Sequence, residues 1–310
     1  MTPRGRAFAV GLAWAIGCSP LVTASMGPSI AGQAESVIVR SQSGLQMLAP
    51  VAAEPRLRIV LPDSATPDSS IEVLVPEHVT AVKQGSATAE QLYLFRPDAE
   101  PNAPAWRRKG SALEYQRTLP GPVLFTARAT LENDGVRFFY EFANGSAVVF
   151  SMITAVTDPR LTGIFQDVRL ERTYVHHQDG FDLLASEVPE RLTMPLEKWL
   201  PARVLASFRW PVPAERREPR EGGLTHYNKS RGVDLPFIAT RSSDGTWVVA
   251  SVSREAGNVW SNPELTCQHV DPQTSLQPGQ RTAIEVKLLI LRGSLNDALE
   301  HAVRQRGSLK

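Results

Sequence analysis

The sequence has few cysteines, no long apolar segment and no excess of charge of either sign. Cys18 and Cys267 are its two cysteines, so removal of the N-terminus on export would leave no intramolecular disulfide and a fold held by its apolar core. No apolar run reaches the roughly 20 residues of a membrane-spanning helix. The 33 basic residues balance 32 acidic ones, and a near-neutral chain without a basic stripe argues against nucleic acid as a partner.

The first 24 residues are typical of a secretory signal peptide. Arg4 and Arg6 precede ten uncharged residues at positions 7–16, and small residues around Ala24 suit cleavage by a signal peptidase. Alternatively, the sequence Ala-Ile-Gly-Cys at positions 15–18 resembles a bacterial lipoprotein box, which would make Cys18 a lipid anchor. Both routes predict an extracytoplasmic protein, either periplasmic or secreted.

Beyond the signal peptide, composition predicts an arm and then one domain. Residues 25–54 are rich in Ala, Ser, Gly and Gln, which favours a loosely held N-terminal arm. Residues 55–310 are long enough for a single large domain. Within it, the stretch 211–223, rich in Pro, Arg and Glu, is expected to form one exposed loop rather than a domain boundary.

The domain is dominated by strand and turn signals. Asp134-Gly135, Asn144-Gly145 and Asp244-Gly245 each separate two β-rich runs, as hairpin turns do. A helix is indicated after Ser294, where apolar residues recur at helical spacing behind a capping arrangement. The sequence therefore predicts a mainly β fold, a large antiparallel β-sandwich with a short C-terminal helix.

A first polar segment, defined as residues 172–182, contains two adjacent histidines before a turn. Neighbouring residues of a strand point to opposite faces, so His176 and His177 are expected on different faces unless the local chain is a loop. Histidine can act as acid, base or ligand near neutral pH. One reading is that one of the two faces a pocket, grouped with Tyr174 if it is His176. The other is a pair of hydrogen-bonded histidines that stabilise a turn.

A second polar segment, defined as residues 260–272, holds the remaining cysteine. If residues 265–271 are extended, then Cys267, His269 and Asp271 project from one face. Side chains two apart on a strand stand roughly 6–7 Å apart, beyond the hydrogen-bond reach that a thiol and its base require. We therefore expect Cys267 to be a small buried hydrophobic residue and not a nucleophile.

A metal site is an open alternative. His176 or His177, together with His269 and a carboxylate such as Asp182 or Glu264, would make an open ligand set of the catalytic type. The histidine and cysteine spacings contain no established metal-binding motif. The leading prediction therefore includes no metal ion and no cofactor, and a metal-dependent enzyme is kept as an alternative.

The second polar segment resembles the C-terminal end of galactose mutarotase-like proteins. Thr-Cys-Gln-His-Val-Asp-Pro at 266–272 and Leu-Gln-Pro-Gly at 276–279 are similar to the Glu-x-Gln and Pro-Asp segment and the Leu-x-Pro-Gly turn of those proteins. His176-His177 ahead of Gly-Phe-Asp at 180–182 is similar to their histidine-glycine stretch. The resemblance implies a large antiparallel fold of the supersandwich type that binds or acts on carbohydrate. The family's general-base glutamate is replaced by Thr266, so epimerase activity does not follow from it.

These observations lead to three hypotheses. The first is an exported protein that binds or processes carbohydrate or glycan in a cleft lined by both polar segments, with acid–base chemistry of an epimerase, lyase or hydrolase type if it is an enzyme. The second is a non-catalytic envelope or assembly module, and the third is the metal-dependent enzyme described above. The expected catalytic residues are His176, His177, Asp182, Glu264 and His269, and the expected substrate-binding residues are Arg172, Tyr174, Trp260, Asn262 and Gln268.

Overall fold

The computed structural model describes residues 35–50, 54–62, 70–96, 105–209 and 223–310. The predicted signal peptide 1–24, the first part of the predicted arm and nearly all of the predicted loop 211–223 lie outside these ranges. No helix within them is long and apolar enough to cross a membrane.

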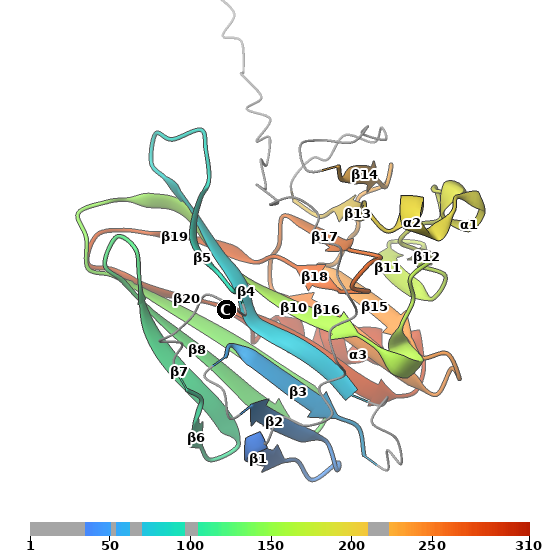
Figure 1. Ribbon diagram of the computed structural model, residues 1–310, viewed down its shortest axis with the longest axis horizontal. Coiled ribbons are helices and arrows are strands. Elements are labelled where there is room, and N and C mark those ends of the chain that lie inside the picture. The colour runs from blue at the N-terminus through green and yellow to red at the C-terminus, as the bar shows by residue number, and fades with distance from the viewer. Residues whose placement is uncertain (1–34, 51–53, 63–69, 97–104, 210–222) are drawn as a thin grey trace, which may run out of the picture.

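Three sheets make up the fold (Figure 1). The seven-stranded sheet has the order β1-β2-β3-β4-β10-β19, and β5 pairs with β4. Its strands are β1 (Glu35–Arg40), β2 (Gln46–Pro50), β3 (Arg56–Val60), β4 (Ser70–Lys83), β5 (Glu90–Leu94), β10 (Phe150–Leu161) and β19 (Gln273–Leu276).

The nine-stranded sheet has the order β12-β11-β15-β16-β20-β9-β8-β7-β6. Its strands are β6 (Arg107–Lys109), β7 (Ala112–Leu119), β8 (Val123–Glu132), β9 (Gly135–Asn144), β11 (Thr173–His177), β12 (Gly180–Leu183), β15 (Phe237–Arg241), β16 (Trp247–Ser253) and β20 (Arg281–Arg292). A four-stranded sheet, β14-β13-β17-β18, lies beside them, with β13 (Ala202–Ser207), β14 (Thr225–Asn228), β17 (Asn258–Ser261) and β18 (His269–Val270).

The two larger sheets share one apolar core, as a sandwich requires. Hydrogen bonds from buried tyrosines cross this core to the opposite sheet. Tyr115 of β7 donates to the carbonyl of Val75 in β4 at 2.6 Å, and the hydroxyls of Tyr140 in β9 and Thr157 in β10 lie 2.7 Å apart. The prediction of a mainly antiparallel β-sandwich is confirmed.

Two of the three predicted hairpins are present: β8–β9 at Asp134-Gly135 and β15–β16 at Asp244-Gly245. The third prediction is wrong, because Asn144-Gly145 leads from β9 in the nine-stranded sheet to β10 in the seven-stranded sheet. The β8–β9 hairpin depends strictly on glycine. β8 and β9 pair from Val123–Asn144 to Glu132–Gly135 around a two-residue turn. Gly135 has φ of 137°, and a Cβ atom there would lie 1.9 Å from the carbonyl oxygen of Leu288. The predicted helix is α3 (Leu295–Arg306), and it begins with a capping box between Ser294 and Asp297.

Two expectations are corrected. Much of the predicted loose arm is ordered sheet, because β1 and β2 pair with each other and β2 pairs with β3. Alternating apolar residues explain this: Val39 and Met47 are buried, which stabilises an extended chain against the core. The fold is also not purely antiparallel, since β13 and β14 pair in parallel. Three short helical segments join the strands: η1 (Gly163–Phe165), α1 (Glu190–Thr193) and α2 (Leu196–Trp199).

The C-terminal helix is joined to the sheet by a buried charge. The side chain of Lys287 in β20 has no solvent exposure, and its ammonium contacts Glu132 and, at 2.6 Å, Asp134 in the β8–β9 turn. Asp134 also lies 3.0 Å from Nδ1 of His301 and accepts a hydrogen bond from Gln305, both on α3. A buried ammonium without partners would be strongly destabilising, so this cluster holds the turn, β20 and α3 together.

Replacement of Asp134 by asparagine should therefore destabilise the fold. We expect D134N to lose about 2 kcal/mol of unfolding free energy, less than the roughly 3–5 kcal/mol for a buried charge left without any partner, because Glu132 still pairs with Lys287. Denaturant titration followed by circular dichroism would measure the loss. The matched control is D179N, because Asp179 sits in another hairpin turn and pairs with the exposed Arg231. Solvent screens that pair, so D179N should leave the unfolding free energy nearly unchanged.

The effect of D134N should also depend on pH. Burial by itself raises the pKa of Asp134, but Lys287, His301 and Gln305 together lower it from 3.8 to about 2. The stabilisation is therefore present above pH 3.8 and is lost as pH falls through about 2. The difference in unfolding free energy between wild type and D134N should therefore decrease as pH falls from 3.8 to about 2. A gap that stays constant, or one no larger than that of D179N, would contradict this account.

Candidate functional site

The two histidines of the first polar segment stabilise a neighbouring loop. Nδ1 of His176 lies 2.9 Å from Oδ1 of Asp234, and Nδ1 of His177 lies 2.9 Å from the carbonyl oxygen of Gly232. His177 is buried and His176 is partly exposed, which agrees with the expected alternation of faces along β11. Both rings therefore contact residues 232–234, the arrangement described by the hydrogen-bonded alternative.

Two of the other residues expected from the first polar segment, Asp182 and Arg172, also have structural partners. Asp182 accepts hydrogen bonds from Nζ of Lys229 at 2.6 Å and from Oγ of Ser186 at 2.9 Å, and the side chain of Lys229 has no solvent exposure. The guanidinium of Arg172 donates to three backbone carbonyls, including that of Arg241 at 2.6 Å. Tyr174 is partly exposed in β11. The contacts of Asp182 and Arg172 stabilise the loops around them.

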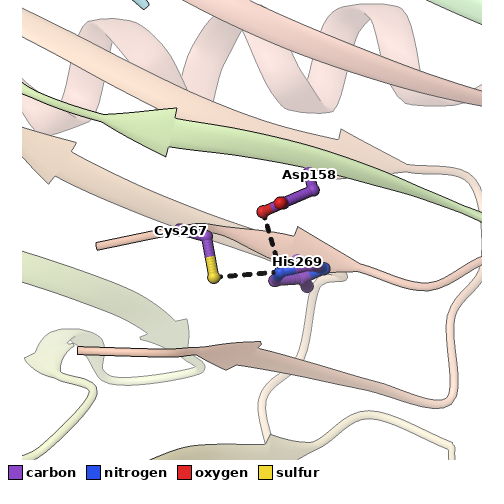
Figure 2. Close-up of side chains that lie close together, drawn as sticks. All are labelled: Asp158, Cys267 and His269. Carbon is purple, nitrogen blue, oxygen red and sulfur yellow. Dashed lines mark hydrogen bonds and ion pairs between the residues drawn. The ribbon is translucent and has the colours of Figure 1, made fainter. Parts of the chain in front are cut away.

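The centre of the second polar segment is a buried cluster of three different ionisable groups. Nε2 of His269 lies 3.0 Å from Sγ of Cys267 and 3.3 Å from Oδ1 of Asp158, and each of the three residues is only 1% exposed. Figure 2 shows the thiol and the carboxylate approaching the same side of the imidazole. The expectation that Cys267 and His269 stand too far apart for a hydrogen bond is wrong, because the imidazole reaches back along the strand toward the sulfur.

Two further side chains hold the imidazole from its other sides. The ring of Trp260 in β17 stacks on that of His269 with 3.8 Å between centroids and an angle of 10°. Nε1 of Trp260 donates to Oδ2 of Asp271 at 2.6 Å, and Oδ1 of Asp271 lies 3.8 Å from Nδ1 of His269. Cys267 and Asp271 therefore both lie near the imidazole of His269. The assumption that residues 265–271 are extended is wrong at its start, because residues 265 and 266 lie in a turn.

Asp158 and its neighbours were not among the residues expected at the site. Asp158 and Arg160 come from β10, and Nε of Arg160 donates to Oδ2 of Asp158 at 2.8 Å. Arg160 also lies 3.8 Å from Glu77 in β4, next to His78. β10 and β4 pair with an irregularity in register between Val156 and Asp158. The available signal was charge inside otherwise apolar strands, in Val-Pro-Glu-His-Val at 75–79 and Val-Thr-Asp-Pro-Arg at 156–160.

The electrostatics of the cluster follow from burial and mutual contact. Burial by itself raises the pKa of Asp158, but His269 and Arg160 hold that pKa below its usual range. Burial would lower the pKa of His269, whereas its contacts with Cys267 and Asp158 raise it well above the ordinary value. Burial raises the pKa of the Cys267 thiol and that of Asp271. The raised pKa of the thiol disfavours the thiolate form that a nucleophile requires, despite its short distance from the histidine.

We call Asp158, Arg160, Trp260, Cys267, His269 and Asp271 the His269 cluster. Within the described ranges, Asp158, Cys267 and His269 form the one group of three His, Cys or acidic side chains close enough to share an ion. The alternative ligand set of His176 or His177 with His269 and Asp182 or Glu264 is thus not assembled there. Glu264 is exposed, and its backbone N–H donates to the side chain of Asn262, so these two residues form a turn.

The two polar segments do meet, but through a buried chain of hydrogen bonds rather than through their histidines. Nε2 of Gln268 donates to Oγ1 of Thr240 at 2.6 Å, and that oxygen lies 2.9 Å from Oγ1 of Thr173. Thr173 in turn donates to Asp167 at 2.8 Å. Gln268, expected to bind substrate, is therefore 1% exposed and joins the second segment to the nine-stranded sheet.

Comparison with known proteins gives similarity in structure only. No protein-family profile matches the chain, and no curated protein matches it in sequence. Among solved structures, the galactose mutarotase related enzyme from Lactobacillus acidophilus is similar over 84% of this chain and 99% of its own, with 9% identity and a TM-score of 0.48. A protein from Synechocystis sp. PCC 6803 is similar over 84% and 97%, with 9% identity and a TM-score of 0.49.

The α-N-acetylgalactosaminidase NagBb from Bifidobacterium bifidum, as a complex with GalNAc, is similar over 88% of this chain and 39% of its own, with 13% identity and a TM-score of 0.47. Galactose mutarotase-like proteins, the group that the second polar segment resembles, are thus among the solved structures similar to this chain.

The link through Gln268 can be tested by stability. Replacement of Gln268 by leucine removes the amide that donates to Thr240 inside the protein, and we expect a loss of roughly 1–2 kcal/mol of unfolding free energy. The control is Q178L, because Gln178 is exposed in the β11–β12 turn and should change stability by less than about 0.5 kcal/mol. Equal stability of the two variants in denaturant titrations would show that the link contributes nothing.

Proposed function

We propose that the protein is an extracytoplasmic β-sandwich protein that binds or processes carbohydrate, and that sugar is bound at the His269 cluster. The observation that carries this proposal is the position of Trp260. Its partly exposed indole stacks on His269 and donates to Asp271, which places a flat apolar ring beside a carboxylate. Sugar rings are recognised by this combination of an aromatic face and hydrogen-bonding groups.

The surroundings of Trp260 support a polar ligand. Asp271, Arg160, Glu77 and His78 are all partly exposed, and they supply hydrogen-bond donors and acceptors of both charges next to the buried part of the cluster. The resemblance of residues 266–279 to galactose mutarotase-like proteins falls on the same segment. Both points favour a sugar over a purely apolar ligand.

The position and contacts of Thr266 favour sugar binding over sugar turnover. In the resembled family a glutamate general base stands at this position, whereas Thr266 is buried and donates its hydroxyl to the carbonyl of Leu161. The side chain therefore points into the sheet. Processing of sugar would need a different base, and the acid–base residues expected in the first polar segment contact loops instead.

The non-catalytic envelope or assembly module remains the second candidate. It requires His177, His269 and Trp260 to be inaccessible and far apart. His177 and His269 are buried, as it requires, but Trp260 is partly exposed and lies in contact with His269. This contact is the specific reason for placing carbohydrate binding first.

A glycan-binding experiment would test the proposal. We expect the purified protein to bind at least one class of glycan in an array, and replacement of Trp260 by alanine to weaken that binding about tenfold, the equivalent of roughly 1.4 kcal/mol. W260F, which keeps an aromatic face, should retain most of the affinity. E264Q is the matched control, because Glu264 lies in the same segment but is exposed and outside the cluster.

Two results would overturn the proposal. A folded wild-type protein that binds no glycan across a broad array would remove the carbohydrate function. Glycan binding that W260A leaves unchanged, with the variant shown to be folded by circular dichroism, would move the binding site away from the His269 cluster.

We further propose export, with residues 1–24 as the signal peptide. Expression of the full chain in a bacterial host should place it outside the cytoplasm, and the mass of the mature protein would identify the cleavage route. Cleavage after Ala24 yields an unmodified N-terminus, whereas a lipid-modified N-terminus at Cys18 that disappears in C18S identifies the lipoprotein route. An uncleaved chain retained in the cytoplasm would contradict export.

A further inference from the structure

We propose that Asp158, Cys267 and His269 bind a transition-metal ion of the zinc type, with a fourth coordination position left for water or a ligand. This inference concerns the interior of the His269 cluster. It goes beyond carbohydrate binding and does not depend on it.

The separations of the three ligand atoms suit a tetrahedral ion. A nitrogen and an oxygen bound at roughly 2.0–2.1 Å in tetrahedral geometry lie about 3.3–3.4 Å apart, and Nε2 of His269 is 3.3 Å from Oδ1 of Asp158. A nitrogen and a thiolate sulfur on the same ion lie about 3.5 Å apart, against 3.0 Å for Nε2 and Sγ of Cys267. All three atoms lie within 4.8 Å of one another. A shift of about half an ångström in the sulfur position would therefore open the site.

The carboxylate oxygen that faces the histidine has no hydrogen bond of its own. Oδ1 of Asp158 is buried and accepts none, although Oδ2 of the same group accepts from Arg160. Its partner on that side is the imidazole at 3.3 Å, a separation longer than that of a strong charge-assisted hydrogen bond, and a buried carboxylate oxygen held this weakly is costly. An ion between Oδ1, Nε2 and Sγ would satisfy this oxygen, which is an argument for a ligand independent of the three residue types.

The residues around the three ligands lie where they can orient those ligands, as is common around metal sites. Metal-binding histidines typically donate from their second nitrogen to a carboxylate, which fixes the tautomer and the ring orientation. Nδ1 of His269 has no hydrogen bond and faces Oδ1 of Asp271 at 3.8 Å, and Asp271 is itself held by Trp260. Proton placement on Nδ1 leaves Nε2 free to bind the ion.

The other two ligands are positioned by backbone and charge. The residue pair Arg160–Cys267 forms a β-bridge, which sets the backbone of the cysteine beside that of β10. Ser261 donates to the carbonyl oxygen of Cys267 at 2.6 Å. Arg160 holds the far oxygen of Asp158, so that the near oxygen is directed at the histidine. Each ligand thus has a contact that fixes its orientation.

The ligand chemistry selects the class of ion. One imidazole, one thiolate and one carboxylate form a mixed set that suits zinc and related divalent metals, and not calcium or magnesium, which prefer oxygen ligands. Three protein ligands with an open fourth position is the pattern of catalytic zinc sites. Coordination replaces the proton on the Cys267 sulfur and any proton on Nε2, so the charge of the ion is balanced by a thiolate and a carboxylate.

Metal analysis and cobalt substitution test the proposal. The full-length protein, stripped with a chelator, incubated with Zn²⁺ and dialysed, should retain about one zinc ion per chain. With Co²⁺ it should show the visible bands of a four-coordinate site and a thiolate-to-cobalt charge-transfer band. X-ray absorption of the zinc protein should show one sulfur neighbour at about 2.3 Å.

The two cysteines of the chain provide matched variants. C267S should lose the charge-transfer band and C18S should keep it; likewise H269A should lose metal and H176A should retain it. Loss of the band in C18S and not in C267S would overturn the assignment. If C267S or H269A fails to fold, the wild-type and C18S spectra decide: folded protein that retains no zinc and shows no sulfur neighbour overturns the proposal.

The glycan experiment is run in parallel on zinc-loaded and chelated protein so that the two proposals can fail separately. One zinc ion per chain without glycan binding supports the metal site and removes the carbohydrate function. Glycan binding by a protein that retains no metal supports the carbohydrate function and removes the metal site.

Discussion

A carboxylate buried in a protein interior must be paired with positive charge, and this requirement organises the centre of the molecule. Asp158 lies in β10, between the two larger sheets' shared core and the small sheet that carries His269. Arg160 contacts one of its oxygens and His269 approaches the other. The register irregularity between β10 and β4 lies beside Asp158, and the β-bridge between Arg160 and Cys267 lies beside its two partners. They bring three separate strands to one buried charge.

The fold was largely predictable from the sequence, because its signals are local. Gly135 and the residues beside it determine a hairpin, and the alternation of Val136, Phe138, Tyr140 and Phe142 determines which face of β9 is buried. The N-terminal strands β1 and β2 were missed because their composition resembles that of a linker, and only pairing with β3 makes them strands. The parallel pairing of β13 and β14 is equally hard to predict, since no turn signal between two strands specifies a parallel neighbour.

The site was predictable only in part, for a different reason. The second polar segment holds its own geometry, so Trp260, His269 and Asp271 were found together. Asp158 lies more than a hundred residues earlier, inside a strand that reads as core, and nothing local links it to His269. The first polar segment was expected to contribute site residues because His176, His177 and Asp182 are reactive residue types. In the structure their contacts stabilise loops. Residue type alone does not separate a ligand from a loop support; burial together with an unsatisfied partner does.

The position of β20 has a consequence for how the chain acquires its structure. It is the last strand in sequence, yet it joins β16 to β9 and so connects the two halves of the nine-stranded sheet. Each half is therefore incomplete while the chain is being synthesised, and contacts of long sequence separation must form at the end. Completion of the nine-stranded sheet therefore waits for residues 281–292, the last strand to be synthesised.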